Sequence, residues 1–413
     1  AYTGKTYGAI LNYYRVFQSG SADTLTADVA TYEAIPRANA ELLTFENVSK
    51  HAQVFGSLNT SNVYNSTENY EKTDRLATRA RAFDSLKSEG GLNWLKWHVL
   101  FWYNSQPSQL VNHTWANEAE IFEYMNGYID RVLDRYSDFK FIDVANEGIN
   151  SSGTYRSIVF SSKSSDPIAW IEHAFKRAAT ARSSSNVLLG YNEYSWTSGL
   201  PTYPKIPNTI SMLQTLLDRG TPIDYVGLQG HLYAIYWSSY QRDLLEQYTQ
   251  QLESMGLQWG FSEFDVTLCD ANGNYYNANT GQYDSGGTKA MAEARKMEIY
   301  QWCAQLVGNS SKALHFQTWG FYDGESWKNS FNHPNSDPLP WDDSYNPVTV
   351  NGVTIPDAIR DAIGGGVVLD GFTPTAGDTL YPIASYKWRD GVGGTIVTQG
   401  TGAPGQHTVN LTG

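Results

Sequence analysis

Cysteine is scarce in this chain of 413 residues, which contains only Cys269 and Cys303. At most one disulfide is therefore available, and the pair would join only in an oxidising compartment and at short range. Cys269 directly follows a predicted strand, whereas Cys303 falls late in the next predicted helix, which has advanced roughly 20 Å by then. The sequence leaves open whether the two cysteines are bonded.

Long hydrophobic runs and an excess of positive charge are also lacking. No apolar run approaches the roughly 20 residues that a membrane span requires, so we expect no membrane association. No basic and then apolar leader is present, and we expect that any signal peptide has already been removed. Lys and Arg number 29 against 42 Asp and Glu, a net charge of −13, which argues against nucleic acid or an anionic membrane as partner.

Motifs that hold metals or phosphates are missing as well. The sequence has no Cys and His cluster with the spacing of zinc ligands and no glycine-rich loop of the phosphate-binding type. We therefore predict neither a metal site nor a cofactor.

Aromatic residues, in contrast, are abundant: they make up 14% of the chain, with 13 Trp and 28 Tyr. Indole and phenol rings pack against the C–H faces of sugars, while their polar edges hydrogen-bond hydroxyl groups. This composition favours carbohydrate as the partner. We expect the protein to act as a monomer. A secreted glycoprotein fits the number of glycosylation sequons, which begin at Asn47, Asn59, Asn65, Asn112, Asn150, Asn309 and Asn410.

Strand-like and helix-like segments alternate along most of the chain. Eight predicted strands cover residues 7–10, 42–47, 95–102, 141–146, 187–192, 225–231, 258–264 and 314–319. Helical periodicity covers residues 73–88, 116–136, 168–181, 210–218, 240–255, 288–306 and 355–363. This alternation predicts an α/β fold, a (β/α)8 TIM barrel over residues 1–365. Residues 366–413 are predicted to form a small β-rich C-terminal appendage or a truncated module.

Loops of unequal length separate these segments. The longer ones, residues 265–287 and 321–347, are expected to wall a cleft at the carboxyl ends of the strands. The polar stretch 56–70 is expected to be a surface excursion.

Polar residues close three of the predicted strands. Residues 141–145 lead into Asn146 and Glu147, and residues 258–262 lead into Glu263. Residues two apart in a strand share a face, which pairs Glu263 with Asp265 and Gln229 with His231. The carboxyl ends of buried strands are where α/β folds keep their chemistry. The alternatives are that Asn146 caps a helix while Glu147 is solvated, and that His231 and Asp265 form a purely structural pair.

These stretches resemble the motifs of glycoside hydrolase family 10, the retaining endo-β-1,4-xylanases, over roughly residues 1–363. Residues 143–147 (DVANE) are similar to the family's acid/base motif, and residues 262–265 (SEFD) to its nucleophile motif. The other similar segments are 46–50 (ENVSK), 97–102 (WHVLFW), 191–194 (YNEY), 228–231 (LQGH), and Trp319-Gly320 with Ser326-Trp327.

The resemblance implies that Glu147 is the acid/base and Glu263 the nucleophile, with His231 and Asp265 supporting Glu263. Such a pair breaks a glycosidic bond by protonating the departing oxygen and attacking the anomeric carbon. The proton donor must stay protonated near neutral pH, which desolvation and a neighbouring negative charge favour. The implied substrate-binding residues are Glu46, Asn47, Lys50, His98, Trp102, Asn146, Asn192, Gln229, Trp319 and Trp327.

Three positions depart from the family pattern. Tyr103 stands where a second His is usual, His51 where Trp is expected, and Glu193 where Asp is expected. We expect all three to border the glycone subsites, which leaves the choice of substrate open. Asn47 lies in both a sequon and the implied sugar site, and we predict that it carries no glycan.

The resulting hypothesis is a secreted endo-β-1,4-xylanase acting on xylan. One alternative is a relative that acts on another β-linked glycan or a plant saponin. Another is a non-catalytic carbohydrate-binding barrel, which would require the loss of a carboxylate, and both carboxylates are present.

Overall fold

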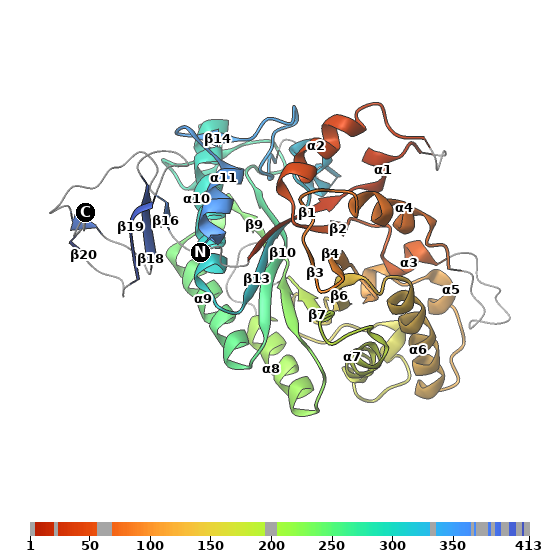
Figure 1. Cartoon of the computed structure of the whole chain (residues 1–413). Helices are drawn as coiled ribbons and strands as arrows, with labels where there is room; N and C mark the ends of the chain where they lie inside the picture. Colours follow the sequence, from red (N-terminus) through yellow and green to blue (C-terminus); the bar gives the residue numbers. More distant parts are fainter. Residues whose placement is uncertain are drawn as a thin grey trace.

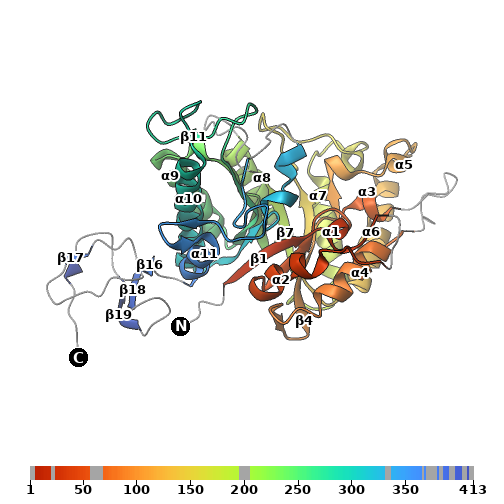
Figure 2. The same cartoon turned by 90° about the horizontal axis from the view of Figure 1, so that it is seen from above.

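A closed ring of parallel strands forms the centre of the molecule (Figures 1 and 2). The computed structural model describes residues 5–19, 24–55, 68–194, 205–330 and 336–364, and the backbone of short strands beyond them. Within the first five ranges, eight strands follow one another around the ring: β1 (Thr6–Leu11), β2 (Leu42–Phe45), β4 (Leu92–Trp97), β6 (Phe139–Asn146), β7 (Leu188–Glu193), β8 (Tyr225–Leu228), β10 (Gln258–Thr267) and β13 (Ala313–Thr318). Pairing of β13 with β1 closes the ring. The predicted (β/α)8 barrel is thus confirmed.

Helices surround the strands, as Figures 1 and 2 show for α4, α6, α7, α9 and α10. The main helices are α2 (Val29–Asn39), α4 (Glu71–Ala80), α6 (Glu118–Arg135), α7 (Ala169–Ala181), α8 (Lys205–Asp218), α9 (Ser239–Ser254), α10 (Lys289–Asn309) and α11 (Ile355–Ile363). Single turns form α1 (Tyr13–Val16), α3 (His51–Val54) and α5 (Ser108–Val111). Side chains that accept a hydrogen bond from the first turn define the start of α6, α9, α10 and α11, namely Asn117, Ser238, Thr288 and Thr354.

Helix α8 begins at Lys205 instead of near residue 210, and two other helices differ more from the sequence prediction. Helix α4 ends at Ala80 instead of near residue 88, because the chain continues in tight turns and the Ser85 hydroxyl donates to the Ala40 carbonyl. Helix α2 was not predicted, and it contains Pro36 near its end, a residue that usually argues against a helix.

Two predicted strands are interrupted. The strand predicted over 95–102 divides into β4 and β5 (Phe101–Trp102), and the strand predicted over 225–231 divides into β8 and β9 (His231–Tyr233). Gly230 separates the latter two with a φ of 77°, a backbone conformation that favours glycine. Gln229 and His231 are therefore not alternate residues of one continuous strand, as the sequence suggested.

Short strands follow the barrel. They are β16 (Val367–Val368), β17 (Thr379–Leu380), β18 (Ser385–Arg389), β19 (Ile396–Thr401) and β20 (His407–Thr408), with β18 and β19 paired antiparallel. The predicted β-rich character of this segment agrees with them, whereas the boundary at residue 365 stays a prediction. Most of the predicted surface excursion, residues 56–67, lies outside the described residues.

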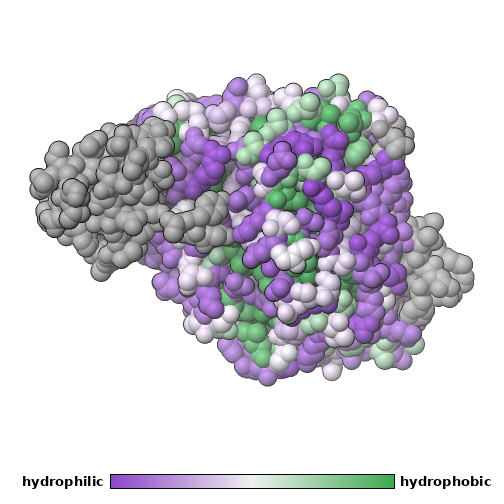
Figure 3. Space-filling model, in the orientation of Figure 1, coloured by the Kyte–Doolittle hydropathy of each residue, from purple (hydrophilic) through white to green (hydrophobic). Residues whose placement is uncertain are grey.

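The described surface is largely hydrophilic on the face drawn in Figure 3, where hydrophobic residues form separate areas. Among the residues described, no helix has the length and apolar character needed to span a membrane. Cys269 and Cys303 are both buried thiols and do not form a disulfide with each other.

Candidate active site

A cavity of about 570 Å³ opens at the carboxyl ends of the barrel strands, the end at which TIM barrels carry their active sites. It collects side chains from segments more than 300 residues apart in the sequence. The lining residues are Asn12, Glu46, Asn47, Lys50, His98, Trp102, Tyr103, Asn104, Asn146, Glu147, Gln229, His231, Glu263, Trp319, Glu325, Ser326 and Trp327. Both predicted catalytic carboxylates thus face one cavity.

Glu263 lies in β10 and is held by donors on both of its oxygens. The Asn192 amide donates to Oε1 at 2.7 Å, and His231 Nε2 donates to Oε2 at 3.1 Å. Burial by itself would raise the pKa of Glu263, but the bond from His231 and the nearby charges of His98, His231 and Lys50 outweigh it and lower the pKa. Glu263 is therefore ionised at neutral pH, as a nucleophile must be.

His231 bridges two carboxylates. Its Nδ1 lies 2.9 Å from Oδ2 of Asp265, on the side opposite Glu263. Burial lowers the pKa of His231, but the charge of Asp265 and the hydrogen bonds to both carboxylates raise it to about 9. At neutral pH both ring nitrogens therefore carry protons and both donate. The Trp327 indole also donates to Oδ2 of Asp265, at 2.8 Å, which links this aromatic wall to the same network.

His98 is the third group beside Glu263, with its Nε2 3.8 Å from Oε1. Its Nδ1 is held by Asp143 at 2.8 Å, and Asp143 also accepts from the Tyr225 hydroxyl inside the barrel. Gly190 makes room for this arrangement, because a Cβ there would lie 2.1 Å from the Tyr225 ring. The barrel core thus fixes the orientation of the His98 ring.

Glu147 follows β6 in a left-handed backbone conformation, with a φ of 54° that side-chain-bearing residues seldom adopt. The Gln229 amide donates to its Oε1 at 2.9 Å. The backbone after it is held as well: the Gly148 N–H donates to the Tyr191 hydroxyl at 2.9 Å and the Ile149 N–H to Glu193 at 3.3 Å. The unusual conformation is therefore stabilised from both sides.

Three amides connect the two glutamates. Oδ1 of Asn146 accepts from Asn192 at 3.0 Å and from Gln229 at 3.2 Å, the same amides that hold Glu263 and Glu147. A Cβ at Gly227 would lie 2.1 Å from Oδ1 of Asn192, so only glycine fits beneath this amide. Asn192 is fully buried and is not among the residues that line the cavity, and it donates to both Asn146 and Glu263. Its contact with substrate stays a prediction.

Tryptophans form the walls of the cavity. The Lys50 ammonium lies 5.0 Å from the Trp102 ring and 5.5 Å from the Trp319 ring, and it donates to Asn47 at 2.8 Å. Asn47 is exposed at the cavity rim. A glycan there would cover the cavity, and the absence of one stays a prediction.

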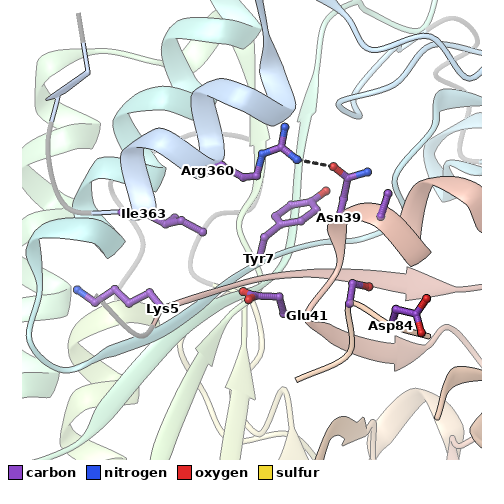
Figure 4. Close-up of a pocket in the computed structure, with 10 residues that line it drawn as sticks. Lys5, Tyr7, Asn39, Glu41, Asp84, Arg360 and Ile363 are labelled. Carbon is purple, nitrogen blue, oxygen red and sulfur yellow. Dashed lines mark hydrogen bonds between the residues drawn. The ribbon is translucent and has the colours of Figure 1, made fainter. Parts of the chain in front are cut away.

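A second cavity, of about 410 Å³, lies at the opposite end of the barrel beside Tyr7, Glu41 and Asp84 (Figure 4). Its cations already have protein partners, since Lys5 donates to the Gly308 carbonyl at 2.9 Å and Arg360 to Asn39 at 2.6 Å. The amino-terminal end of a TIM barrel serves stability more than catalysis. We therefore place the active site at the carboxyl ends of the strands.

The family model for glycosyl hydrolase family 10 matches residues 8–352. The chain belongs to glycosyl hydrolase family 10. The resemblance stated from the sequence motifs is thus confirmed, and the family 10 match covers the barrel from within β1 to the residues just before α11.

Curated relatives are distant and only partly overlapping. Endo-1,4-beta-xylanase B of Thermotoga neapolitana is 26% identical over 60% of this chain and 65% of its own length. Endo-1,4-beta-xylanase D of Talaromyces funiculosus is 27% identical over 62% of this chain and 56% of its own length. The matched region therefore spans less than two thirds of either relative.

Solved structures agree in fold. The crystal structure of xylanase 10B from Thermotoga petrophila RKU-1 in complex with xylobiose superposes with a TM-score of 0.69, at 21% identity, over 87% of this chain and 94% of that one. Xylanase10C from Cellvibrio japonicus, solved as a mutant in complex with xylopentaose, also gives 0.69, at 20% identity, over 87% of this chain and 67% of that one.

Two of the three departures from the family 10 pattern do not line the cavity, whereas all three were expected to border the sugar subsites. His51 is fully buried, with its ring 4.1 Å from that of Tyr128 and its Nε2 2.7 Å from the Tyr124 hydroxyl. Glu193 is also buried and forms an ion pair with Lys205 at 2.8 Å. Tyr103 alone of the three lines the cavity.

Sequence reasoning missed Asn12, Asn104, Glu325 and Ser326 in the cavity wall. Glu325 accepts from the Tyr32 hydroxyl and from the Phe321 N–H, each at 2.9 Å. Burial raises the pKa of Glu325 to about 8, and the negative charge of Glu46 contributes to the rise. Its position two residues before Trp327, inside the last family motif, was the signal that could have found it.

Replacing Glu325 should change how stability depends on pH. A carboxyl group with a raised pKa stabilises the fold below its unfolded pKa and loses that contribution as pH rises through about 8. Glu325→Gln cannot ionise, so its melting temperature relative to wild type should rise by about 2 °C or more between pH 5 and pH 9. Calorimetry at both pH values measures this, with the exposed Glu246→Gln as control. A melting-temperature difference between Glu325→Gln and wild type that is the same at both pH values would contradict the raised pKa of Glu325.

Among the residues described, no group of three or more His, Cys, Asp and Glu side chains is placed to hold a metal ion. The prediction that no cofactor is needed stays a prediction.

Proposed function

We propose that this protein is a retaining endo-β-1,4-xylanase that hydrolyses xylan by double displacement. The observation that carries the proposal is the placement of Glu147 and Glu263 in one open cavity, connected through Gln229, Asn146 and Asn192. Membership of family 10 supports the reaction class, and the names of the curated relatives support xylan as substrate.

In the first step, Glu263 attacks the anomeric carbon while Glu147 gives its proton to the departing glycosidic oxygen. The lowered pKa of Glu263 keeps the attacking carboxylate ionised. The imidazolium of His231 hydrogen-bonds this carboxylate and, being held by Asp265, cannot turn away from it. The product is a glycosyl ester of Glu263 and a shortened xylan chain.

In the second step, Glu147 is a carboxylate and takes a proton from water, whose oxygen attacks the anomeric carbon and releases Glu263. Two inversions restore the original β configuration. The Asn146 side chain is fixed through its Oδ1 by two amides, and its amino group donates to Oε1 of Glu147 at 3.5 Å. The second N–H of that amino group can meet the sugar's 2-hydroxyl. Such a contact strengthens at the transition state.

Product analysis tests the proposal. Wild-type protein incubated with β-1,4-xylan should release xylo-oligosaccharides, and NMR of the earliest products should show the β anomer before mutarotation. Release of the α anomer first would contradict retention. No release from xylan, with hydrolysis of mixed-linkage β-glucan or a saponin instead, would favour another substrate within the family.

The proposal includes secretion and action as a monomer. Its support is compositional: the acidic chain, the density of sequons and the aromatic content suit an extracellular protein that acts on a neutral polysaccharide. Mass spectrometry of the natural protein would detect glycans, and a glycan on Asn47 would contradict the role of that residue in binding sugar.

A further inference from the structure

Arg156 is the cation nearest to the acid/base in the contacts that the structure gives. It lies in the loop that follows β6, with its Nη2 3.7 Å from Oε2 of Glu147. Gln229 holds the other oxygen of the same carboxyl group. The two oxygens of Glu147 thus meet different partners, one a neutral amide and one a guanidinium.

The guanidinium of Arg156 is itself fixed in place. It stacks on the Tyr103 ring, with its central carbon 3.7 Å from the ring centroid, and its Nη2 donates to the Tyr194 hydroxyl at 2.8 Å. The Arg156 N–H donates to the Gly148 carbonyl at 2.8 Å, which ties the loop to the residue after Glu147. Tyr103 is the one departure from the family pattern that lines the cavity. The guanidinium of Arg156 stacks on the ring that this departure provides.

We propose that Arg156 is a positioning residue for Glu147: it holds the carboxyl group of Glu147 and favours the ionised form. Tyr103 and Tyr194 hold the guanidinium of Arg156 in place for this role. This inference rests on the proposed role of Glu147 as acid/base. An adjacent guanidinium stabilises the carboxylate that must accept a proton from water, and it disfavours the protonated form that the first step needs. Arg156 would therefore set the balance between the two steps.

Other charged and titratable groups also face Glu147. They are Lys50, Tyr103, Glu193, Tyr194 and Lys205 around it, with His231 and Glu263 across the cavity. Glu193 and Lys205 pair with each other at 2.8 Å, so their charges largely cancel at Glu147. Lys50 donates to Asn47 and lies over the tryptophan wall. Arg156 is thus the cation placed to act directly on this carboxyl group.

The pH dependence of catalysis tests the proposal. In Arg156→Gln, the alkaline limb of kcat/KM on xylan should move to higher pH by about one unit, because the protonated acid persists longer. On an aryl xyloside with a very acidic phenol, where the second step limits kcat, the acidic limb of kcat should move in the same direction. Arg156→Lys retains the charge and should keep both limbs near their wild-type positions.

The control is Arg177→Gln, which removes an arginine of α7 that pairs with Asp130 of α6. It should leave both limbs unchanged. If Arg156→Gln loses activity while both limbs stay in place, the residue is merely structural and the inference is wrong. If the wild type fails to hydrolyse xylan or any aryl xyloside, the proposed function fails instead, so the two failures are distinguishable.

Discussion

Glu263→Ala should abolish hydrolysis of every substrate, whatever its leaving group. Without the carboxylate no glycosyl ester forms, and removal of such a nucleophile costs roughly 10⁴-fold or more in kcat. Because the glycosyl ester of Glu263 must form with either kind of substrate, the loss should be the same on xylan and on aryl xylosides. Initial rates on both substrates measure it.

Glu263→Gln is the companion variant, since it keeps the size of the side chain and removes its charge. It should be as inactive as the alanine variant while remaining folded by circular dichroism. Glu246→Gln, an exposed change on α9, should retain wild-type rates. Full activity in both Glu263 variants would contradict the assignment of the nucleophile.

The architecture could be predicted because its signals are local. Each barrel strand is a short apolar run between helix-length segments, and strand ends were placed within a few residues. Breaks within strands were harder to predict. The turn at Gly230 depends on how β9 pairs with β10, a contact that no nearby residue signals.

The residues of the candidate site also fall into those that local sequence signals identify and those that they do not. Residues carried by strand-end motifs, such as Glu147 and Glu263, were identified from their neighbours in the sequence. Glu325 and Arg156 were not, because their roles arise from groups far away in the chain: Tyr32 for Glu325, and Tyr103 for Arg156. The burial of His51 and Asn192 was missed for the same reason, since their neighbours in the sequence carry no sign of the rings and amides that enclose them.

Glu147→Gln should separate substrates by their leaving groups. Hydrolysis of xylan needs a proton on the departing oxygen, so its rate should fall by about 10²- to 10⁴-fold, the usual contribution of a general acid. A dinitrophenyl xyloside departs without protonation and should still form the glycosyl ester of Glu263. The new glutamine still offers an amide oxygen to the Gln229 amino group, so the cavity should keep its shape.

The second step provides the sharper measurement for Glu147→Gln. With no base to activate water, the glycosyl ester should accumulate, giving a burst of dinitrophenol equal to the enzyme concentration followed by slow turnover. Mass spectrometry should then detect xylose bound to the peptide that carries Glu263. An equal fall in rate for xylan and the dinitrophenyl xyloside, with no burst, would contradict the role of Glu147. Loss of an acid/base affects these two substrates unequally, because the nucleophile in β10 is still in place.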